Sequence, residues 1–282
     1  MMTCDLHTHS VFSDGTYTPT EIVDAAIRLG LSAVALCDHN TVDGLPEFLS
    51  AAEGKNIEAV AGAEFSVDYN GTELHLLGLF IPETQFSRIS RLMETTMEYK
   101  QQSNLDLIHA LNQAGYRIDF EEIRNTTRNG TFNRSHIARA LTEKGYTASI
   151  KEAFDTLLSP TAGFYKEPQR LSFWEMLDAL TEMGAVPVLA HPFLNLDEAR
   201  LTALLPLAKE RGLSGIECIY SLYDPATTQT SFNLARRFGL KCSGGSDFHG
   251  STKPDITLGT GKGNLEIPYE WVSILKSTDN VR

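Results

Sequence analysis

Short apolar runs rich in Val, Ile, Leu and Ala recur along this chain, and segments with helical periodicity follow most of them. This alternation is typical of βα units, so the sequence predicts an α/β protein built on a parallel sheet. A first helix is expected at 20–29, with Thr18 as its N-cap and Gly30 as its stop. Strands are expected at 4–6, 33–37, 58–61, 73–80, 185–190, 215–219 and 241–243.

The alternation stops between about residues 86 and 171. This stretch is polar and poor in strand patterns, and its helical patterns lie at 93–114, 135–144 and 150–158. A chain of 282 residues has about the length that one α/β barrel with an insertion uses. We therefore expect a barrel from residues 1–85 and 172–282, and an inserted helical subdomain from residues 86–171.

Histidines and carboxylates lie in or just after the expected strands. His7 and His9 are two residues apart, so on an extended strand their rings project from one face, as paired metal ligands require. In parallel α/β architectures the C-terminal strand ends share one rim, where residues distant in sequence converge. The sequence therefore predicts a metal site at this rim, formed by His7, His9, His39, Glu64, His75, His191, Asp247 and His249.

Charge and composition exclude several other classes. A net charge of −12 argues against the extended basic surface that duplex nucleic acid needs. The chain contains no run of 18 or more apolar residues, which predicts no membrane span. Its first residues lack the basic region and apolar run of a signal peptide, so we expect a cytoplasmic protein.

Six motifs carry a family resemblance. In chain order they are DLHTHS, SDGT, CDHNTVDG, GAEFS, AHP and GSDFHG. Together they resemble those of the PHP (polymerase and histidinol phosphatase) superfamily of metal-dependent phosphoesterases. The insertion, followed by Asn133-Arg134-Ser135-His136, resembles the subgroup of nucleoside 3′,5′-bisphosphate phosphatases and 5′-to-3′ RNA-trimming enzymes. The resemblance implies a distorted (β/α)7, TIM-like barrel and, as partner, a small nucleotide or a short RNA end.

The resemblance also implies three metal sites that share ligands. The expected groups are His7, His9, Glu64 and Asp247; Glu64, His75 and His191; and Asp14, His39 and His249. Glu64 would bridge two ions, because a carboxylate can do so and a neutral imidazole cannot. Two to three divalent ions are expected, with manganese favoured over zinc, iron or magnesium. The oxygen of Asp14 is a hard ligand, which weighs against zinc at the third site, although Asp14 can also be read as a turn residue.

These ligand types suit the hydrolysis of phosphate esters. Divalent ions neutralise phosphate oxygens and activate the water that attacks phosphorus. Catalytic roles are accordingly expected for the three carboxylates Asp14, Glu64 and Asp247. His136 is a further candidate, because it can bind phosphate or donate a proton to the leaving oxygen.

Substrate contacts are expected from the insertion, at Lys100, Ser103, Asn104, Arg134, Ser135 and His136. Arg134 can grip a phosphate through two hydrogen bonds, or it can be a solvated arginine at a helix start behind Asn133. Relatives often carry two arginines three residues apart where this chain has Lys100 and Ser103, which removes a planar charged fork. Lys166 can compensate for this loss, or it can be an ordinary exposed lysine.

The resemblance implies, as the favoured activity, removal of the 3′-phosphate from nucleoside 3′,5′-bisphosphates, with trimming of short 5′-phosphorylated RNA as a related reaction. Two alternatives stay open: a phosphatase for another small ester such as histidinol phosphate, and a non-catalytic metal-binding module. The insertion argues against the compact histidinol phosphatases, and the complete ligand set argues against a non-catalytic module. Asn40 stands where aspartate is usual after Asp38-His39, and we expect it to change hydrogen bonds around the ligands.

Overall fold

The computed structural model describes residues 2–127 and 132–277 of the chain. Within these residues seven strands form one sheet, and they pair in chain order. They are β1 (Cys4–Thr8), β2 (Ala33–Leu36), β3 (Glu58–Tyr69), β4 (Thr72–Leu79), β5 (Val186–Ala190), β6 (Gly215–Tyr220) and β7 (Lys241–Gly245). All seven begin within a residue of the predicted positions, and β3 extends well beyond its predicted end.

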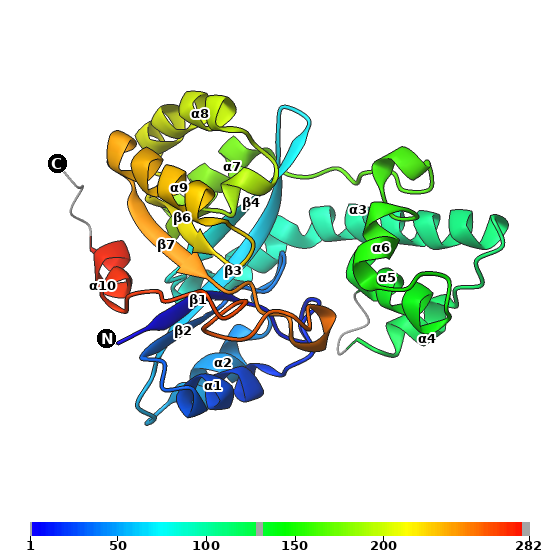
Figure 1. Cartoon of the computed structure of the whole chain (residues 1–282), viewed down its shortest axis with the longest axis horizontal. Helices are drawn as coiled ribbons and strands as arrows, with labels where there is room; N and C mark the ends of the chain where they lie inside the picture. Colours follow the sequence, from blue (N-terminus) through cyan, green and yellow to red (C-terminus); the bar gives the residue numbers. More distant parts are fainter. Residues whose placement is uncertain (1, 128–131, 278–282) are drawn as a thin grey trace.

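The sheet curves until β7 approaches β1, which gives a nearly closed barrel (Figure 1). The backbone N–H of Asp247 donates to the carbonyl of His7 at 2.9 Å across this junction. The fully buried carboxylate of Asp5 accepts hydrogen bonds from Ser246 N (2.9 Å) and Ser246 Oγ (2.5 Å). A buried carboxylate needs such donors, so Asp5 ties the first strand to the segment after the last one. The predicted α/β barrel is confirmed.

One strand departs from the prediction. β4 runs antiparallel to both β3 and β5, whereas the other neighbours are parallel. β3 turns directly into β4 through Asn70 and Gly71, whose φ angles are +53° and +77°. This two-residue hairpin turn is far too short for the crossover that parallel strands require. The expectation of a parallel sheet is therefore wrong at β4, and the barrel is distorted there.

Helices cover the outside of the barrel (Figure 1). They are α1 (Pro19–Arg28), α2 (Leu45–Ala52), α7 (Phe173–Glu182), α8 (Glu198–Glu210), α9 (Pro225–Phe238) and α10 (Glu270–Lys276). Elsewhere the chain forms short 3₁₀ turns at Glu83–Gln85, Pro160–Ala162, Pro192–Leu194 and Gly250–Thr252. Thr18 caps α1 as predicted, because its hydroxyl accepts from Glu21 N at 3.1 Å. The largest apolar cluster packs all of these helices except α10 against the strands and includes Phe48, Phe65 and Phe173. A second cluster, which includes Leu6, Val60, Leu77 and Val188, fills the inside of the barrel.

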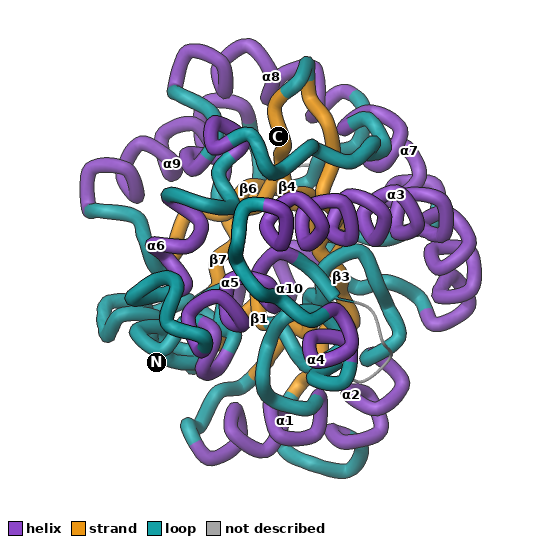
Figure 2. Tube along the Cα trace, turned by 90° about the vertical axis from the view of Figure 1, so that its right-hand side faces the viewer, coloured by secondary structure: helices purple, strands orange, loops and turns teal. Residues whose placement is uncertain are grey.

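Four helices lie to one side of the barrel, and Figure 2, seen from that side, shows them in front of the strands. They are α3 (Phe86–Gln113), α4 (Phe120–Arg124), α5 (Arg134–Glu143) and α6 (Ile150–Asp155). Buried residues such as Leu107, Phe132 and Ile137 form an apolar cluster of their own there. We call these helices and their connections the helical insertion. Its domain limits at 86 and 171 stay a prediction.

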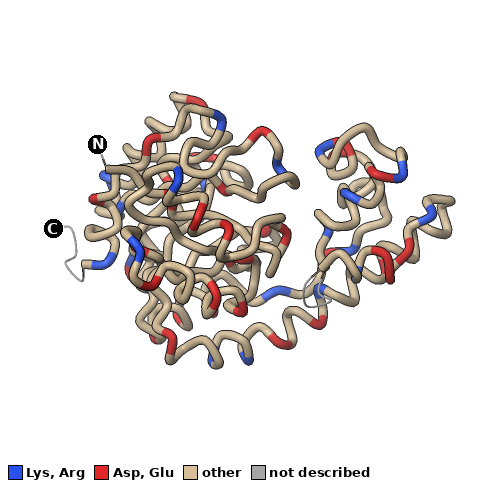
Figure 3. The backbone as a smooth tube through the Cα atoms, turned by 90° about the horizontal axis from the view of Figure 1, so that it is seen from below, with Lys and Arg blue, Asp and Glu red and all other residues tan. Residues whose placement is uncertain are grey.

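None of the helices in the described residues combines the length and the apolar character that crossing a membrane requires. Figure 3 shows Lys and Arg interspersed with Asp and Glu along both the barrel and the insertion.

The close approach of β7 to β1 yields a test of the barrel closure. At Gly245 a Cβ atom would lie 2.2 Å from His7 Cβ and 2.6 Å from His7 N. We expect Gly245→Ala to lower the free energy of unfolding by about 3 kcal/mol or more, because the neighbouring backbone cannot move aside. Denaturant unfolding measures this loss.

Gly54→Ala is the matched control. No atom lies within 4 Å of the added methyl group, but the φ angle of Gly54 is +71°. Its expected cost is about 1–2 kcal/mol, from the left-handed backbone alone. Equal losses in the two variants would contradict a rigid contact between β1 and β7.

Candidate metal centre and substrate cavity

The nine side chains predicted as metal ligands lie together at one end of the barrel: His7, His9, Asp14, His39, Glu64, His75, His191, Asp247 and His249. Most of them lie at or just after the C-terminal end of a strand, as the rim argument requires. His75 arrives differently, because it lies in the first half of the antiparallel strand β4. It pairs there with Ser66 of β3, two residues after Glu64, and with Ala190 of β5, directly before His191.

Glu64 is the centre of this cluster and is fully buried. Its Oε2 oxygen faces three imidazole nitrogens, those of His39 Nδ1 (3.0 Å), His7 Nε2 (3.2 Å) and His9 Nε2 (3.3 Å). Its Oε1 oxygen faces two more, those of His75 Nδ1 (2.7 Å) and His191 Nε2 (2.9 Å). Burial alone raises the pKa of Glu64, but the surrounding imidazoles, His75 first, hold that pKa well below its usual range.

Two further carboxylates flank Glu64. Asp14 Oδ1 lies 3.2 Å from His249 Nε2, and Asp247 Oδ1 lies 3.2 Å from His9 Nε2. Burial raises the pKa of both carboxyl groups, yet His249 beside Asp14 and Lys253 beside Asp247 hold the two pKa values well below the usual range. All three carboxylates are therefore anionic, which is the form that binds cations.

The cluster fits divalent cations. Several of its buried polar atoms have no hydrogen-bond partner in the part of the chain that the structure describes: His7 Nε2, His9 Nδ1, His9 Nε2, Asp14 Oδ1, His39 Nδ1 and Glu64 Oε2. Some of them lie about 3 Å from one another, but without the directions that hydrogen bonds require. Buried polar atoms are normally paired, and imidazole nitrogens and carboxylate oxygens are the ligands that manganese, iron and zinc accept.

Glu217 in β6 belongs to the site, although the sequence analysis does not identify it. It is fully buried, its Oε1 lies 3.0 Å from His7 Nδ1, and its Oε2 accepts from His191 N at 2.7 Å. A carboxylate behind a histidine fixes the orientation of the ring and which nitrogen faces the metal. The sequence signal that could identify Glu217 is a single glutamate within the otherwise apolar run 215–220.

Two residues after β2 hold the neighbouring loops in place. The carboxylate of Asp38 accepts from Ser10 Oγ and Ser13 Oγ, both at 2.6 Å. Asn40 has a φ angle of +56°, a conformation that asparagine adopts more easily than most residues, and its Oδ1 accepts from Ser66 N at 3.0 Å. This placement agrees with the expectation that Asn40 acts on hydrogen bonds around the ligands.

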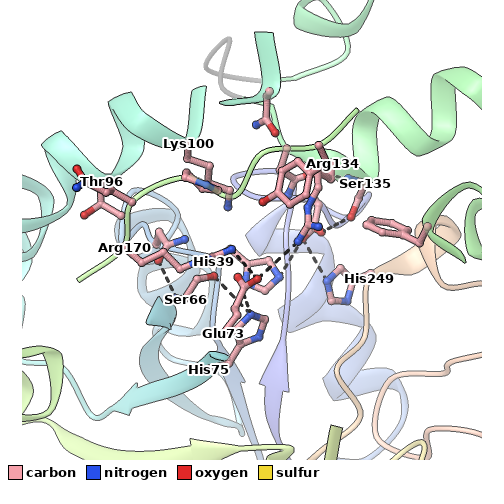
Figure 4. Close-up of a pocket in the computed structure, with 18 of the residues that line it drawn as sticks. His39, Ser66, Glu73, His75, Thr96, Lys100, Arg134, Ser135, Arg170 and His249 are labelled. Carbon is pink, nitrogen blue, oxygen red and sulfur yellow. Dashed lines mark hydrogen bonds and ion pairs between the residues drawn. The ribbon is translucent and has the colours of Figure 1, made fainter. Parts of the chain in front are cut away.

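A cavity of about 240 Å³ adjoins the cluster, between the barrel and the helical insertion (Figure 4). His39, His75 and His249 face it from the barrel, and Lys100 and Arg134 face it from the insertion. Asp14, Asn104 and Ser135 also line it.

The insertion touches the ligand cluster directly. Ser135 Oγ donates to Asp14 Oδ2 at 2.9 Å. The guanidinium of Arg134 stacks over the ring of Tyr165, 4.1 Å from its centroid, which limits its orientation. Asn133 caps α5, so Arg134 begins a helix and also lines the cavity.

Two predicted substrate residues lie outside the lining of this cavity. The hydroxyl of Ser103 donates to the backbone carbonyl of Lys166. His136 Nδ1 lies 2.8 Å from Asn133 Oδ1, and burial lowers the pKa of His136 to about 4, so its ring is neutral near pH 7. Their roles toward substrate stay predictions. Glu73 and Arg170, which the sequence analysis did not single out, do line the cavity.

Buried histidines and carboxylates thus lie together at the strand ends of the barrel, beside a cavity lined by Lys100 and Arg134. This combination is typical of a metal-dependent hydrolase of phosphate esters. Residues 5–170 match the PHP domain family, and the chain belongs to it. It is a phosphoesterase, a hydrolase that acts on phosphoric ester bonds.

Its relatives cover most of the chain. The sequence is 31% identical over 250 residues to a phosphoribosyl 1,2-cyclic phosphate 1,2-diphosphodiesterase from Eggerthella lenta (87% of this chain, 94% of the relative). It is 28% identical over 246 residues to a 5′-3′ exoribonuclease from Haemophilus influenzae (87% and 89%). It is also 28% identical over 251 residues to a 3′,5′-nucleoside bisphosphate phosphatase from Chromobacterium violaceum (88% and 88%).

A solved structure shares the whole fold. The crystal structure of a proposed metal-dependent phosphoesterase from Bifidobacterium adolescentis superposes with a TM-score of 0.86 at 28% identity, and covers 99% of this chain and 97% of that one. The distorted TIM-like barrel that the resemblance implied is therefore confirmed.

The central position of Glu64 leads to a prediction. We expect Glu64→Gln to lower bound metal and to reduce turnover by about three orders of magnitude, because the amide removes the charge that five imidazoles surround. Elemental analysis and phosphate release measure the two effects. Glu175→Gln, at the exposed N-terminus of α7, is the control. Unchanged metal content in Glu64→Gln would show that this carboxylate does not hold the ions.

Proposed function

We propose that this phosphoesterase removes the 3′-phosphate from nucleoside 3′,5′-bisphosphates. The observation that carries the proposal is the cavity with two chemically different ends. One end holds the imidazoles and carboxylates, and the other presents Lys100 and Arg134. A substrate with two phosphates complements both ends, because the 3′-phosphate lies at the cluster of imidazoles and carboxylates while the 5′-phosphate contacts Lys100 and Arg134.

The same proposal assigns the ions to three ligand groups: His7, His9, Glu64 and Asp247; Glu64, His75 and His191; and Asp14, His39 and His249. The close grouping of His9, Asp14, His39 and His249, and of His7, His9 and Glu64, supports this assignment. When bound, divalent ions neutralise phosphate oxygens and lower the pKa of a water molecule. Manganese is the proposed metal, because the ligands mix imidazole with carboxylate and Asp14 adds a hard oxygen.

The residues of the insertion bind and orient the substrate in this proposal. Arg134 offers a planar guanidinium already held over Tyr165, and Lys100 adds a point charge. Ser135 orients Asp14 through its hydroxyl. The contact between His136 and Asn133 favours a role in holding the start of α5 over proton donation. Residues 86–171 then act as a cap that supplies the positively charged side chains of Lys100 and Arg134.

Trimming of short 5′-phosphorylated RNA is the second candidate. A larger cavity of about 640 Å³ lies beside the first, and Ser135, Phe154 and Lys253 line both. It gives room for nucleotides beyond the ester that is cleaved. Histidinol phosphate fits less well, because its ammonium group would meet Lys100 and Arg134.

The substrate proposal is tested by a phosphate-release screen. We expect chelation to abolish activity and manganese to restore it better than calcium, since calcium prefers an all-oxygen site. The screen compares a nucleoside 3′,5′-bisphosphate, histidinol phosphate, an aryl phosphate and a 5′-phosphorylated trinucleotide. The bisphosphate should be hydrolysed with the highest kcat/KM. Full activity in protein shown to be metal-free, or preference for histidinol phosphate, would refute the proposal.

Arg134→Ala separates recognition from metal binding. We expect unchanged metal content and a loss in kcat/KM of about 30- to 150-fold on the bisphosphate, because a charge-assisted contact to the second phosphate is removed. An aryl phosphate, which has no second phosphate, should lose little. Equal losses on both substrates would place Arg134 at the reacting phosphate instead.

A further inference from the structure

Arg170 supplies a second guanidinium to the cavity, from the segment that leads out of the helical insertion into α7. Its side chain is 6% exposed. Figure 4 shows it on the same side of the cavity as Ser66 and Glu73. A planar fork of donors is the feature that Lys100 does not offer, so this arginine changes what the cavity can bind.

The segment around Arg170 is fixed at several points. Ser103 Oγ of α3 donates to the carbonyl of Lys166. On the barrel side, Asp68 N of β3 donates to the carbonyl of Leu171 at 2.9 Å. Because the backbone is held on both sides of Arg170, little freedom is lost when the guanidinium binds an anion.

Glu73 lies between the two arginines of the cavity. Its Oε2 oxygen lies 2.8 Å from Arg170 Nη2 and 3.7 Å from Arg134 Nη2. One carboxylate oxygen therefore faces both guanidinium groups, and it is the kind of anion that a phosphate oxygen can replace. Arg170 Nη1 also contacts Glu167 Oε2 at 3.0 Å. The contacts to Glu73 and Glu167 together use two of the five N–H donors of Arg170 and leave three.

We propose that Arg170 and Arg134 together bind the phosphate that is not hydrolysed, and that Glu73 occupies the place of this phosphate between them in the free protein. The inference rests on the proposed bisphosphate substrate and names the residues that select it. When the phosphate displaces the Glu73 carboxylate from the arginines, His75 can still pair with it, because Glu73 Oε1 lies 3.6 Å from His75 Nε2. The side chain of Glu73 is 23% exposed, which leaves it room to move.

The proposal makes opposite predictions for the two partners. Arg170→Lys keeps a charge opposite Glu73 but loses the fork, so it should weaken binding of the second phosphate about tenfold. Glu73→Gln removes the competing anion, so it should strengthen that binding several-fold. A purely structural ion pair predicts no gain from Glu73→Gln.

The experiment compares two substrates that differ only in the second phosphate, adenosine 3′,5′-bisphosphate and adenosine 3′-monophosphate. The measured quantity is the ratio of their kcat/KM values in the manganese-loaded enzyme. Calorimetric binding of adenosine 5′-monophosphate, against adenosine, gives a readout that needs no turnover. The control is Arg88→Lys, because Arg88 forms an exposed ion pair with Glu182 at 2.7 Å on the outside of the protein. Metal content and thermal unfolding are measured for every variant.

The expected result is a ratio lowered about tenfold in Arg170→Lys, mainly through KM, raised in Glu73→Gln and unchanged in Arg88→Lys. Adenosine 5′-monophosphate binding should follow the same order. A wild-type enzyme that shows no preference for the bisphosphate would refute the proposed function itself. A wild-type preference that Arg170→Lys leaves intact would refute this inference alone. A fall in Glu73→Gln would show that Glu73 positions Arg170, and would overturn the exchange of anions.

Discussion

The carboxylate of Glu64, buried among five imidazoles, is the interaction on which the rest of the structure depends. A charge without compensation in that position would cost several kcal/mol, so each surrounding ring has to arrive at its place. The rings come from β1, from β4 and from the loops after β1, β2 and β5. Their convergence requires the sheet to curve and the strand registers to be fixed. The closure of the barrel and the geometry of the ligands therefore depend on each other. The close approach at Gly245 and the hydrogen bonds of Asp5, which close the barrel, also help to position the ligand cluster.

Most of that centre could be predicted because its signals are local. Ligands that end apolar strands can be recognised one strand at a time, and the rim of a parallel sheet then brings them together. Glu217 was missed although a glutamate inside an apolar strand is such a signal. The antiparallel turn of β4 was also readable, since Asn70-Gly71 between two strands is a strong hairpin signal. This signal implies an antiparallel strand within the barrel, which the expected parallel sheet does not include.

The substrate end of the cavity was harder to predict, and the reason is physical. Lys100, Arg134 and Arg170 lie on three separate segments whose meeting depends on how the insertion folds over the barrel. Sequence spacing carries no information on such long-range packing. Ser103 illustrates this: its spacing of three residues from Lys100 predicts a substrate contact, but it does not reveal that the hydroxyl donates to the backbone carbonyl of Lys166. In the proposed function the barrel carries out the chemistry and the insertion selects the substrate, in line with the separation of fold and site in many enzymes.

Strand β4 connects the ligand cluster of the barrel with the cavity beside the insertion. Alternate residues of a strand share one face, so Leu79, Leu77, His75 and Glu73 follow one another along the inner side of the barrel. Leu79 and Leu77 belong to the apolar filling of the barrel, His75 contacts Glu64, and Glu73 contacts Arg170. One strand face therefore passes from core to ligand cluster to substrate cavity. Because β4 is antiparallel, this order runs against the chain direction, and Glu73, which lines the cavity, is the residue of the four nearest the hairpin.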